Sequence, residues 1–459
     1  MAGPTDRSRV RTAAHSPSYF SLIRAAPEEG EELIDFCVPC NPYFPTPEAF
    51  GVLEHNLSTI LKFYPSDADT ITAELCGVLG LNPQTVVMGN GSTELITWID
   101  HLLVRESLAV PIPTFGRWTD QPMETGKRVD MYPLPENQGF ALDVDAFVNF
   151  VRHRGSRVAV ICNPNNPDGG YLRRHEVIAL LDRLVDLDLV VVDESFIDFV
   201  DAEPYPSVAN EAAIRPNVIV LKSLGKNFGL HGIRFGYMVA NPALADRVRR
   251  ALPKWNLNSF AETVVFMIRQ YMSEYLDSLR LVALDRESMR YQLTRVPGLT
   301  VFPSQGNFLL VRLPGGRDGA ALRDQLLDEH NLFVRECGNK LGMTSQFMRL
   351  VVRPERDVRR LISGLYAVLY ESGNRSLSPV PPPLPIPTPI PTPTPLYDPL
   401  PASLSTSPPL YDPLPASLST PPPPYDSLPA SFSTPPQTQT PLYEGDRRFD
   451  MLSALPPSV

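Results

Sequence analysis

The chain has 459 residues, a hydrophobic share of 43% and a formal net charge of −10. This length and composition are sufficient for a large buried core and predict more than one domain. The negative balance argues against a general binder of nucleic acid or anionic membranes, because such surfaces need clustered excess lysine and arginine. Small molecules and other proteins are therefore the expected partners.

The cysteines and the apolar runs of the sequence indicate in which cellular compartment the protein is expected. Five cysteines are an odd number spread through the chain, which is typical of a reducing environment. The one CxxC pair, Cys37 and Cys40, lacks the four nitrogen or sulfur ligands that zinc usually takes, so no metal is expected. We find no signal-peptide pattern at the N-terminus and no run of roughly 20 apolar residues that could cross a bilayer. The sequence predicts a cytoplasmic protein.

Strand-like and helix-like patterns alternate through the first part of the chain. Short β-rich runs such as SRVAVICNPNN, DLVVVDESF and NVIVLKSLG are separated by amphipathic stretches such as STELITWIDHLLV and LRRHEVIALLDRLVD. This alternation predicts an α/β domain with a mostly parallel sheet covered on both faces. In such a sheet the strand ends, and the loops leaving them, carry the chemistry.

The composition then changes twice. One long helical segment, ETVVFMIRQYMSEYLDSLRLVALDRESMRYQLTRV, precedes strands around NFLLVRL, FVREC and FMRLVV, which predicts a smaller α+β domain. A cleft between two domains is a usual ligand site. We expect an N-terminal arm, a large domain, a small C-terminal domain and a proline-rich tail, over residues 1–35, 36–256, 257–373 and 374–459.

The tail contains about half of the chain's 51 prolines, and Tyr397, Tyr411 and Tyr425 mark a motif that repeats every 14 residues. Proline lacks a backbone N–H and cannot build a helix interior or a central strand, so we expect a disordered, extended segment. The repeats suit a partner that recognises polyproline helix. The alternative is a dispensable extension.

Three loops after strand-like runs carry the candidate chemistry. Lys226 lies in SLGKNFGLHGIRFGY, NPNNPDGG covers residues 163–170, and VVVDESFIDF covers residues 190–199. A single lysine after a strand is normally a solvated surface charge. A catalytic role for Lys226 is therefore inferred only because the other two motifs occur in the same chain.

With these motifs, over roughly residues 35–370, the chain resembles fold-type I pyridoxal-phosphate (PLP) enzymes of the class I/II aminotransferase superfamily. The resemblance is to the branch that contains histidinol-phosphate aminotransferase and threonine-phosphate decarboxylase. It implies a PLP-transferase-like large domain with a mostly parallel seven-stranded sheet, PLP as the cofactor, and a homodimer with shared active sites.

The resemblance also implies roles for three residues around the cofactor ring. Lys226 would hold PLP as a Schiff base and move the Cα proton. Asp193 would pair with the pyridinium nitrogen; the alternative is a carboxylate that caps a helix. Asn166 would donate a hydrogen bond to the phenolic oxygen, in a segment that is a turn in any case.

Further residues would hold the cofactor's phosphate and ring. Backbone donors and hydroxyls at a helix N-terminus favour an anion, although the serine and threonine there could equally be plain helix caps. The residues implied for the phosphate are Gly91, Ser92, Thr93, Ser223 and Arg234. Phe115 would stack on the pyridine ring, and Tyr64 would reach the phosphate in the neighbouring subunit. Isolated aromatics are more often core residues, which is the alternative for both.

Two arginines are implied for the substrate. Arg349 would fork onto the α-carboxylate, a geometry that lysine cannot supply, and Arg335 would lie near substrate anionic groups. Surface salt bridging is the alternative for both. A phosphorylated or doubly anionic substrate is consistent with this pair.

The chain departs from the family pattern at three positions. Asp168 replaces a usual threonine, Gly225 stands where a serine often precedes the lysine, and Phe196 replaces a tyrosine that would bond the phenolic oxygen. We expect an aminotransferase, since that activity dominates the superfamily. The alternatives are α-decarboxylation of a phosphorylated amino acid, and a catalytically silent scaffold that acts through its tail.

Overall fold

The computed structural model describes residues 19, 20, 22 and 32–371. By its internal contacts the chain divides into units of residues 1–379 and 380–459, and all described residues belong to the first. The predictions for the tail and its polyproline-binding partner, and most of those for the N-terminal arm, lie outside the described residues.

A seven-stranded sheet forms the centre of residues 86–239. Six of its strands run as predicted in a mostly parallel arrangement, and β8 is antiparallel to both of its neighbours. The strands are, in spatial order, β2 (Val86–Gly89), β8 (Gly236–Val239), β7 (Val218–Lys222), β6 (Leu189–Asp193), β5 (Val158–Cys162), β3 (Ser107–Ile112) and β4 (Arg128–Pro133).

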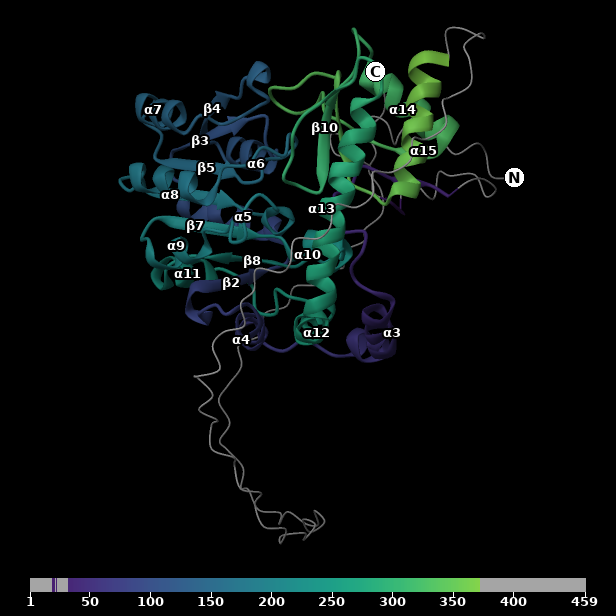
Figure 1. The fold of residues 1–459 in the computed structure, drawn as a ribbon. Helices are drawn as coiled ribbons and strands as arrows, with labels where there is room; N and C mark the ends of the chain where they lie inside the picture. Colours follow the sequence, from purple (N-terminus) through teal and green to yellow (C-terminus); the bar gives the residue numbers. More distant parts are fainter. Residues whose placement is uncertain (1–18, 21, 23–31, 372–459) are drawn as a thin grey trace, which may run out of the picture. The chain divides into compact units, whose positions relative to one another are not determined.

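Helices cover both faces of this sheet (Figure 1). Strand β6 reads LVVVD and is buried along its whole length, as expected for a parallel strand with two covered faces. Its residues alternate between two cores: Val190 and Val192 face one, Leu189 and Val191 the other. The first core is completed by α3 (Pro47–Lys62), α4 (Ala68–Leu79), α7 (Val144–Arg154), α8 (Arg174–Arg183), α9 (Ala209–Ile214) and α12 (Ser259–Met267). The second is completed by α5 (Ser92–Leu103), α6 (Arg117–Glu124) and α11 (Pro242–Arg249).

A second, smaller sheet lies in the C-terminal part of the described chain. Its antiparallel strands are, in order, β12 (Arg335–Glu336), β13 (Phe347–Val351), β10 (Phe308–Arg312) and β9 (Thr300–Val301). Residues of α13 (Met272–Thr294), α14 (Gly319–His330) and α15 (Glu355–Tyr366) share its core. The short strand β1 (Ile34–Asp35) pairs with β11 (Leu332–Phe333), which ties the start of the described chain to this region.

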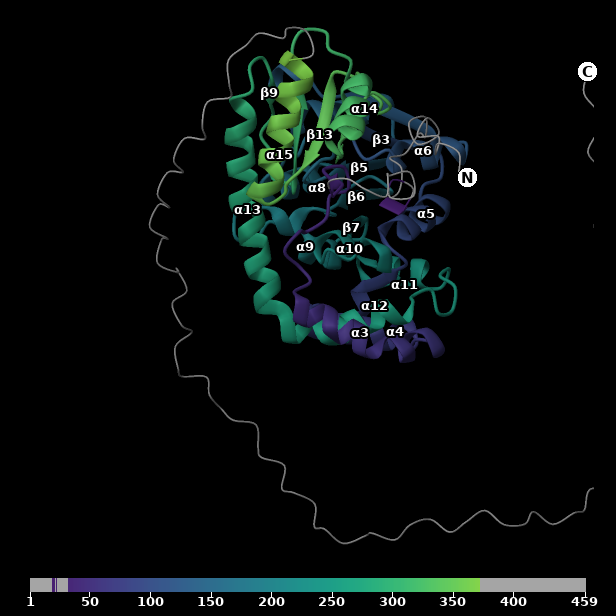
Figure 2. The ribbon, with the colours of Figure 1, turned by 90° about the vertical axis from the view of Figure 1, so that its right-hand side faces the viewer.

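The long predicted helix is interrupted. A 3₁₀ turn, Ile268–Tyr271, separates α12 from α13. The two helices bury side chains in different cores: Val264 of α12 packs under the large sheet, whereas Val282 and Met289 of α13 pack with the small one. Figures 1 and 2 show α13 running from α12 to the small sheet. The turn therefore lets one continuous segment serve both regions.

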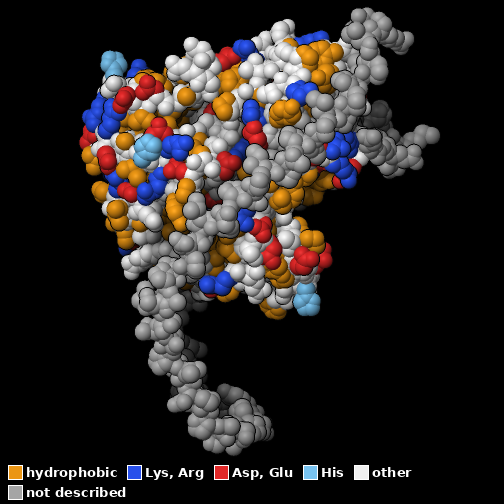
Figure 3. Space-filling model, in the orientation of Figure 1, with side chains coloured by type: hydrophobic (Ala, Val, Ile, Leu, Met, Phe, Trp, Pro, Cys, Tyr) orange, Lys and Arg blue, Asp and Glu red, His pale blue; other side chains and the backbone are white. Residues whose placement is uncertain are grey.

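On the described part of the face in Figure 3, acidic and basic side chains are interspersed. None of the described helices is long and apolar enough to span a membrane. No disulfide bond joins any of the five cysteines, which all lie in the described part of the chain.

Candidate active site

The strand register brings the predicted chemistry to one edge of the large sheet. Cys162 at the end of β5 lies opposite Asp193 at the end of β6, and Asp193 is in turn paired with Leu221 of β7. Lys226 follows β7 on the short helix α10 (Leu224–Asn227). The carboxyl ends of neighbouring parallel strands thus converge where ligands bind in open α/β sheets.

Lys226 lies between two aromatic rings. Its Nζ is 4.4 Å from the ring centroid of Phe196 and 5.4 Å from that of Phe115. Burial lowers its pKa to about 8, against the opposing influence of Asp193. A partly buried amine with a lowered pKa is the form that a covalent or acid–base lysine requires.

The nearby Lys222 has a different environment. Its Nζ lies 3.0 Å from Glu194 Oε2 and 3.9 Å from Asp198 Oδ1. Burial alone would lower the pKa of Lys222, but these carboxylates and Tyr237 together raise it above its ordinary value. Lys222 is therefore a charged structural partner, and of these two lysines Lys226 is the one with a reactive environment.

Asp193 is buried and held by three donors. The indole Nε1 of Trp118 donates to Oδ2 over 2.8 Å, while the backbone N–H and the hydroxyl of Ser195 donate to Oδ1 over 3.1 and 2.5 Å. A carboxylate offers about four lone-pair sites, so Oδ2, which within residues 32–371 accepts only from Trp118, can still accept from a protonated ring nitrogen. Trp118 was not singled out in the sequence.

Asn166 and Arg349 meet, although 183 residues separate them. Arg349 Nη1 donates to Asn166 Oδ1 over 2.7 Å, and Nη2 donates to the carbonyl of Cys37 over 2.6 Å. The guanidinium carbon lies 5.3 Å from the ring centroid of Phe308. Burial lowers the pKa of Arg349, and its buried Nε has no partner among the described residues. A side chain fixed in this way, with one donor unused, is poised for an anionic ligand.

An anion cradle forms where α5 begins. Gly91 has φ 79°, and a Cβ on it would lie 2.7 Å from Arg234 Nη2. A Cβ on Gly236 would lie 3.0 Å from the backbone nitrogen of Ser92 and 2.6 Å from the carbonyl of Lys222, so the start of β8, the end of β7 and the start of α5 are in close contact. Within residues 32–371 Arg234 has no carboxylate at ion-pair distance.

The other residues predicted for the phosphate fit the same corner. Ser92 is buried at the first turn of α5, and Thr93 follows it. Ser223, also buried, directly follows Lys222. No side chain caps the N-terminus of α5, so its backbone donors remain available for an anion. These groups fit the phosphate of PLP.

Tyr64 is not brought to this cluster within the described chain. Its side chain is 83% exposed, and its ring stacks on Trp255 with centroids 5.2 Å apart. The predicted role for Tyr64 involves a second subunit, and it stays a prediction.

A pocket of about 310 Å³ opens beside the cluster. Phe115, Asn166, Arg349 and Arg335 all line it, so the ring-stacking candidate and both predicted substrate arginines share one cavity. Lys340 and Arg117 line it as well. Neither was singled out in the sequence, because isolated charges have no periodic signal.

The departures from the family pattern have local explanations. A Cβ on Gly225 would lie 3.2 Å from the carbonyl of Leu230, so a serine would fit there only after a small backbone shift. Asp168 is buried, which raises its pKa to about 6, and it accepts from the backbone N–H of Gly170 over 2.7 Å. Phe196 is buried with its ring edge-to-face on Phe308.

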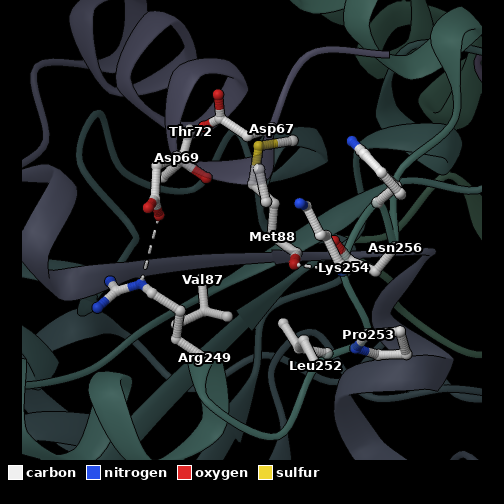
Figure 4. Close-up of a pocket in the computed structure, with 12 residues that line it drawn as sticks. Asp67, Asp69, Thr72, Val87, Met88, Arg249, Leu252, Pro253, Lys254 and Asn256 are labelled. Atoms are coloured by element: carbon white, nitrogen blue, oxygen red, sulfur yellow. Dashed lines mark hydrogen bonds and ion pairs between the residues drawn. The ribbon is translucent and has the colours of Figure 1, made fainter. Parts of the chain in front are cut away.

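A separate pocket of about 180 Å³ lies between the start of α4 and residues 249–256 (Figure 4). Arg249 Nε lies 4.0 Å from Asp69 Oδ1, and Asn256 Nδ2 donates to the carbonyl of Met88 over 3.0 Å. None of the residues predicted for cofactor or substrate lines this pocket. The pocket beside Arg349 is therefore the candidate site.

Comparisons with known proteins agree with this geometry. The chain is 29% identical over 373 residues to an L-serine phosphate decarboxylase of Campylobacter jejuni, covering 78% of this chain and 94% of the relative. It is 28% identical over 316 residues to a histidinol-phosphate aminotransferase of Ruminiclostridium cellulolyticum, covering 68% and 85%. The crystal structure of L-threonine-O-3-phosphate decarboxylase from Porphyromonas gingivalis matches with a TM-score of 0.65 and 25% identity, over 73% of this chain and 99% of that one.

These relatives confirm the predicted fold class and the resemblance to both enzyme groups. The family model for class I and II aminotransferases matches residues 32–365. The chain belongs to the class I and II aminotransferase family of enzymes, and its cofactor is pyridoxal phosphate.

Proposed function

We propose that the chain is a PLP-dependent α-decarboxylase of a small amino acid that carries a phosphate group. The observation that carries the proposal is the charge of the pocket beside the Lys226 cluster. Its lining has four basic side chains and one carboxylate. The lining charges are Arg117, Arg335, Lys340, Arg349 and Asp120. Such an excess of positive charge suits a substrate with two anionic groups. The L-serine phosphate decarboxylase relative supports the same substrate class.

Bound PLP would supply an electron sink for the pair left on Cα when the bond to the carboxylate breaks. Asp193, a buried acceptor, would hold the proton of the ring nitrogen in place. Arg349 would hold the α-carboxylate through its unpartnered Nε and the adjacent Nη2. After CO₂ departs, Lys226 Nζ would deliver a proton to Cα, so that L-phosphoserine, for example, would give O-phosphoethanolamine.

The aromatic wall of the site supports decarboxylation over transamination. Phe196 adjoins Lys226 and packs on Phe308, whose ring lies beside the Arg349 guanidinium. The carboxylate leaves as neutral CO₂, and apolar surroundings that destabilise a charge favour its departure. Phe196 also offers no hydroxyl to the cofactor's phenolic oxygen.

Transamination is the second candidate, and this is the activity we expected from the sequence. Lys226, with its pKa lowered to about 8, is suited to take the Cα proton, which is the step that replaces loss of CO₂. The histidinol-phosphate aminotransferase relative supports this alternative.

The two reactions can be separated by their products. The purified chain, loaded with PLP, is incubated with L-phosphoserine, L-phosphothreonine or histidinol phosphate, each with and without 2-oxoglutarate. Decarboxylation predicts CO₂ and a phosphorylated amine from L-phosphoserine or L-phosphothreonine, independent of the oxo acid, and no product from histidinol phosphate, which has no carboxylate. Glutamate formation without CO₂ would contradict this proposal and favour transamination. The Lys226→Ala chain is the control for uncatalysed loss.

We also propose that the active form is a homodimer. The groove of about 440 Å³ between α3 and α12 is lined by Tyr64 and by Phe63 and Phe266, and all three side chains are exposed to 45% or more. Covering such a face with a second copy would remove apolar surface from water. Mixing inactive Lys226→Ala and Tyr64→Phe chains tests it: hybrid dimers should regain activity if Tyr64 serves the partner's site, and no recovery would contradict that role.

A further inference from the structure

One wall of the pocket beside Arg349 is basic, and its groups come from two segments far apart in the sequence. Arg117 belongs to the start of α6, whereas Arg335 and Lys340 lie in and after β12. Lys340 Nζ donates to the carbonyl of Thr114 over 3.0 Å, which joins the two segments. The pocket is thus closed on this side by a lysine that bridges its two walls.

Lys340 has no carboxylate at ion-pair distance within residues 32–371. Burial lowers its pKa to about 8, and the neighbouring positive charges of Arg349 and Arg335 act in the same direction. An ammonium has three N–H groups, and one bond to a carbonyl leaves two. A partly buried cation with positive neighbours is stabilised most by an anion that enters the pocket.

The other charged side chains of the wall each contact a neighbouring side chain. Arg335 Nη2 donates to Asn339 Oδ1 over 2.8 Å. Arg117 bonds the side chain of Gln121, and its Nη1 lies 3.9 Å from Glu124 Oε2. Asp120, the carboxylate of the lining, accepts from the hydroxyl of Thr119 over 2.9 Å. Within residues 32–371, Lys340 and Arg335 are therefore the two cations of this wall without a carboxylate at ion-pair distance.

We propose that Lys340, with Arg335 beside it, binds the phosphate of the substrate and determines the enzyme's preference for phosphorylated over unphosphorylated amino acids. This inference rests on the proposed function, which requires a distal anion but does not say what holds it. Arg349 is left for the α-carboxylate. A phosphate dianion has three acceptor oxygens, enough for the remaining donors of Lys340 and for the free edge of Arg335.

The test measures binding, so it does not depend on turnover. O-Phosphoethanolamine carries the phosphate but has no carboxylate to lose, and calorimetry with the PLP-loaded full chain gives its Kd. We expect Lys340→Met to weaken this Kd by about 10- to 100-fold, as for loss of a hydrogen bond between charged groups. The Kd of L-serine, measured on the same variant, should change less than about twofold. Lys254→Met, in the pocket of Figure 4, is the matched control and should bind both ligands like the parent.

An unchanged Kd for O-phosphoethanolamine in Lys340→Met would overturn the assignment, and so would an equal loss for L-serine, which would indicate a structural role. If the methionine variant lost its cofactor, Lys340→Arg would take its place: it keeps the charge and should retain affinity within a few fold. A loss there as large as about 100-fold would contradict recognition by charge.

The reaction and the phosphate site can fail separately. Binding of O-phosphoethanolamine that depends on Lys340, in a chain that releases no CO₂ from L-phosphoserine, would reject the decarboxylase and keep the phosphate site. Release of CO₂ by a chain whose affinity for O-phosphoethanolamine ignores Lys340 would do the reverse.

Discussion

The two halves of the site are built differently. The cofactor half lies on the ends of adjacent strands: Asp193 ends β6, and Lys226 follows β7 by four residues. The substrate half is assembled from separate segments: Arg117 begins α6, and Lys340 follows β12 more than two hundred residues later, and both line the pocket. Strand ends give a placement that many reactions can share, whereas residues outside this sheet edge set the substrate. The residues that we assign to the cofactor are therefore those that the family resemblance implies, whereas Arg117 and Lys340 in the substrate half are not among the residues that it implies.

Removal of Asp193 should break the cofactor half. In Asp193→Ala the buried site loses its acceptor for the ring proton, and Trp118 Nε1 loses its partner. Loss of one member of a buried charged pair costs about 3–5 kcal/mol, so kcat/KM should fall by about 150- to 5,000-fold. Steady-state kinetics with L-phosphoserine measures it. Asp69→Ala, in the separate pocket, should behave like the parent; an equal loss there would point to general destabilisation.

Arg349→Lys should damage the contact between the halves. Lysine keeps the charge but not the planar fork, and it cannot bond Asn166 and Cys37 at once as Arg349 does. We expect kcat/KM to fall by about 30- to 100-fold, while the affinity for O-phosphoethanolamine changes little, because that ligand has no carboxylate. A parallel loss of O-phosphoethanolamine affinity would show that the two anion sites are not distinct.

The smallest expected effect concerns the cofactor half, where the rate of PLP attachment to Lys226 should depend on pH. The neutral amine is the nucleophile, and the lowered pKa of Lys226, about 8, makes it available near neutrality. As pH rises the neutral fraction increases, so the rate of PLP attachment to the apoprotein should rise about fivefold from pH 7 to pH 8 and level off above pH 9. Stopped-flow absorbance measures it. A rate still rising tenfold per unit at pH 9 would indicate an ordinary lysine pKa.

The sequence predicted one half of the site better than the other, for a physical reason. Strand ends follow from periodic apolar runs, so the placement of Asp193, Asn166 and Lys226 could be anticipated together with the mostly parallel sheet. The interruption of the long helix at Ile268–Tyr271 could not, since it depends on which core each helix joins.

The sequence held no comparable signal for Lys340 and Trp118. Lys340 becomes part of the pocket through a bond to the carbonyl of Thr114, and Trp118 becomes part of the site through its bond to Asp193. Both contacts join segments that no local pattern connects. Tyr64 contacts Trp255 within this chain, and its predicted role depends on a second copy.

The central claim is that PLP is attached to Lys226. Three lysines are candidates for attachment. Lys222 is ion-paired, whereas Lys226 and Lys340 both have pKa values lowered to about 8. Borohydride reduction of the PLP-loaded chain, followed by digestion and peptide mass spectrometry, identifies the attachment point. We predict a single pyridoxyl label on Lys226. A label on Lys340 or Lys222, or none at all, would contradict the account.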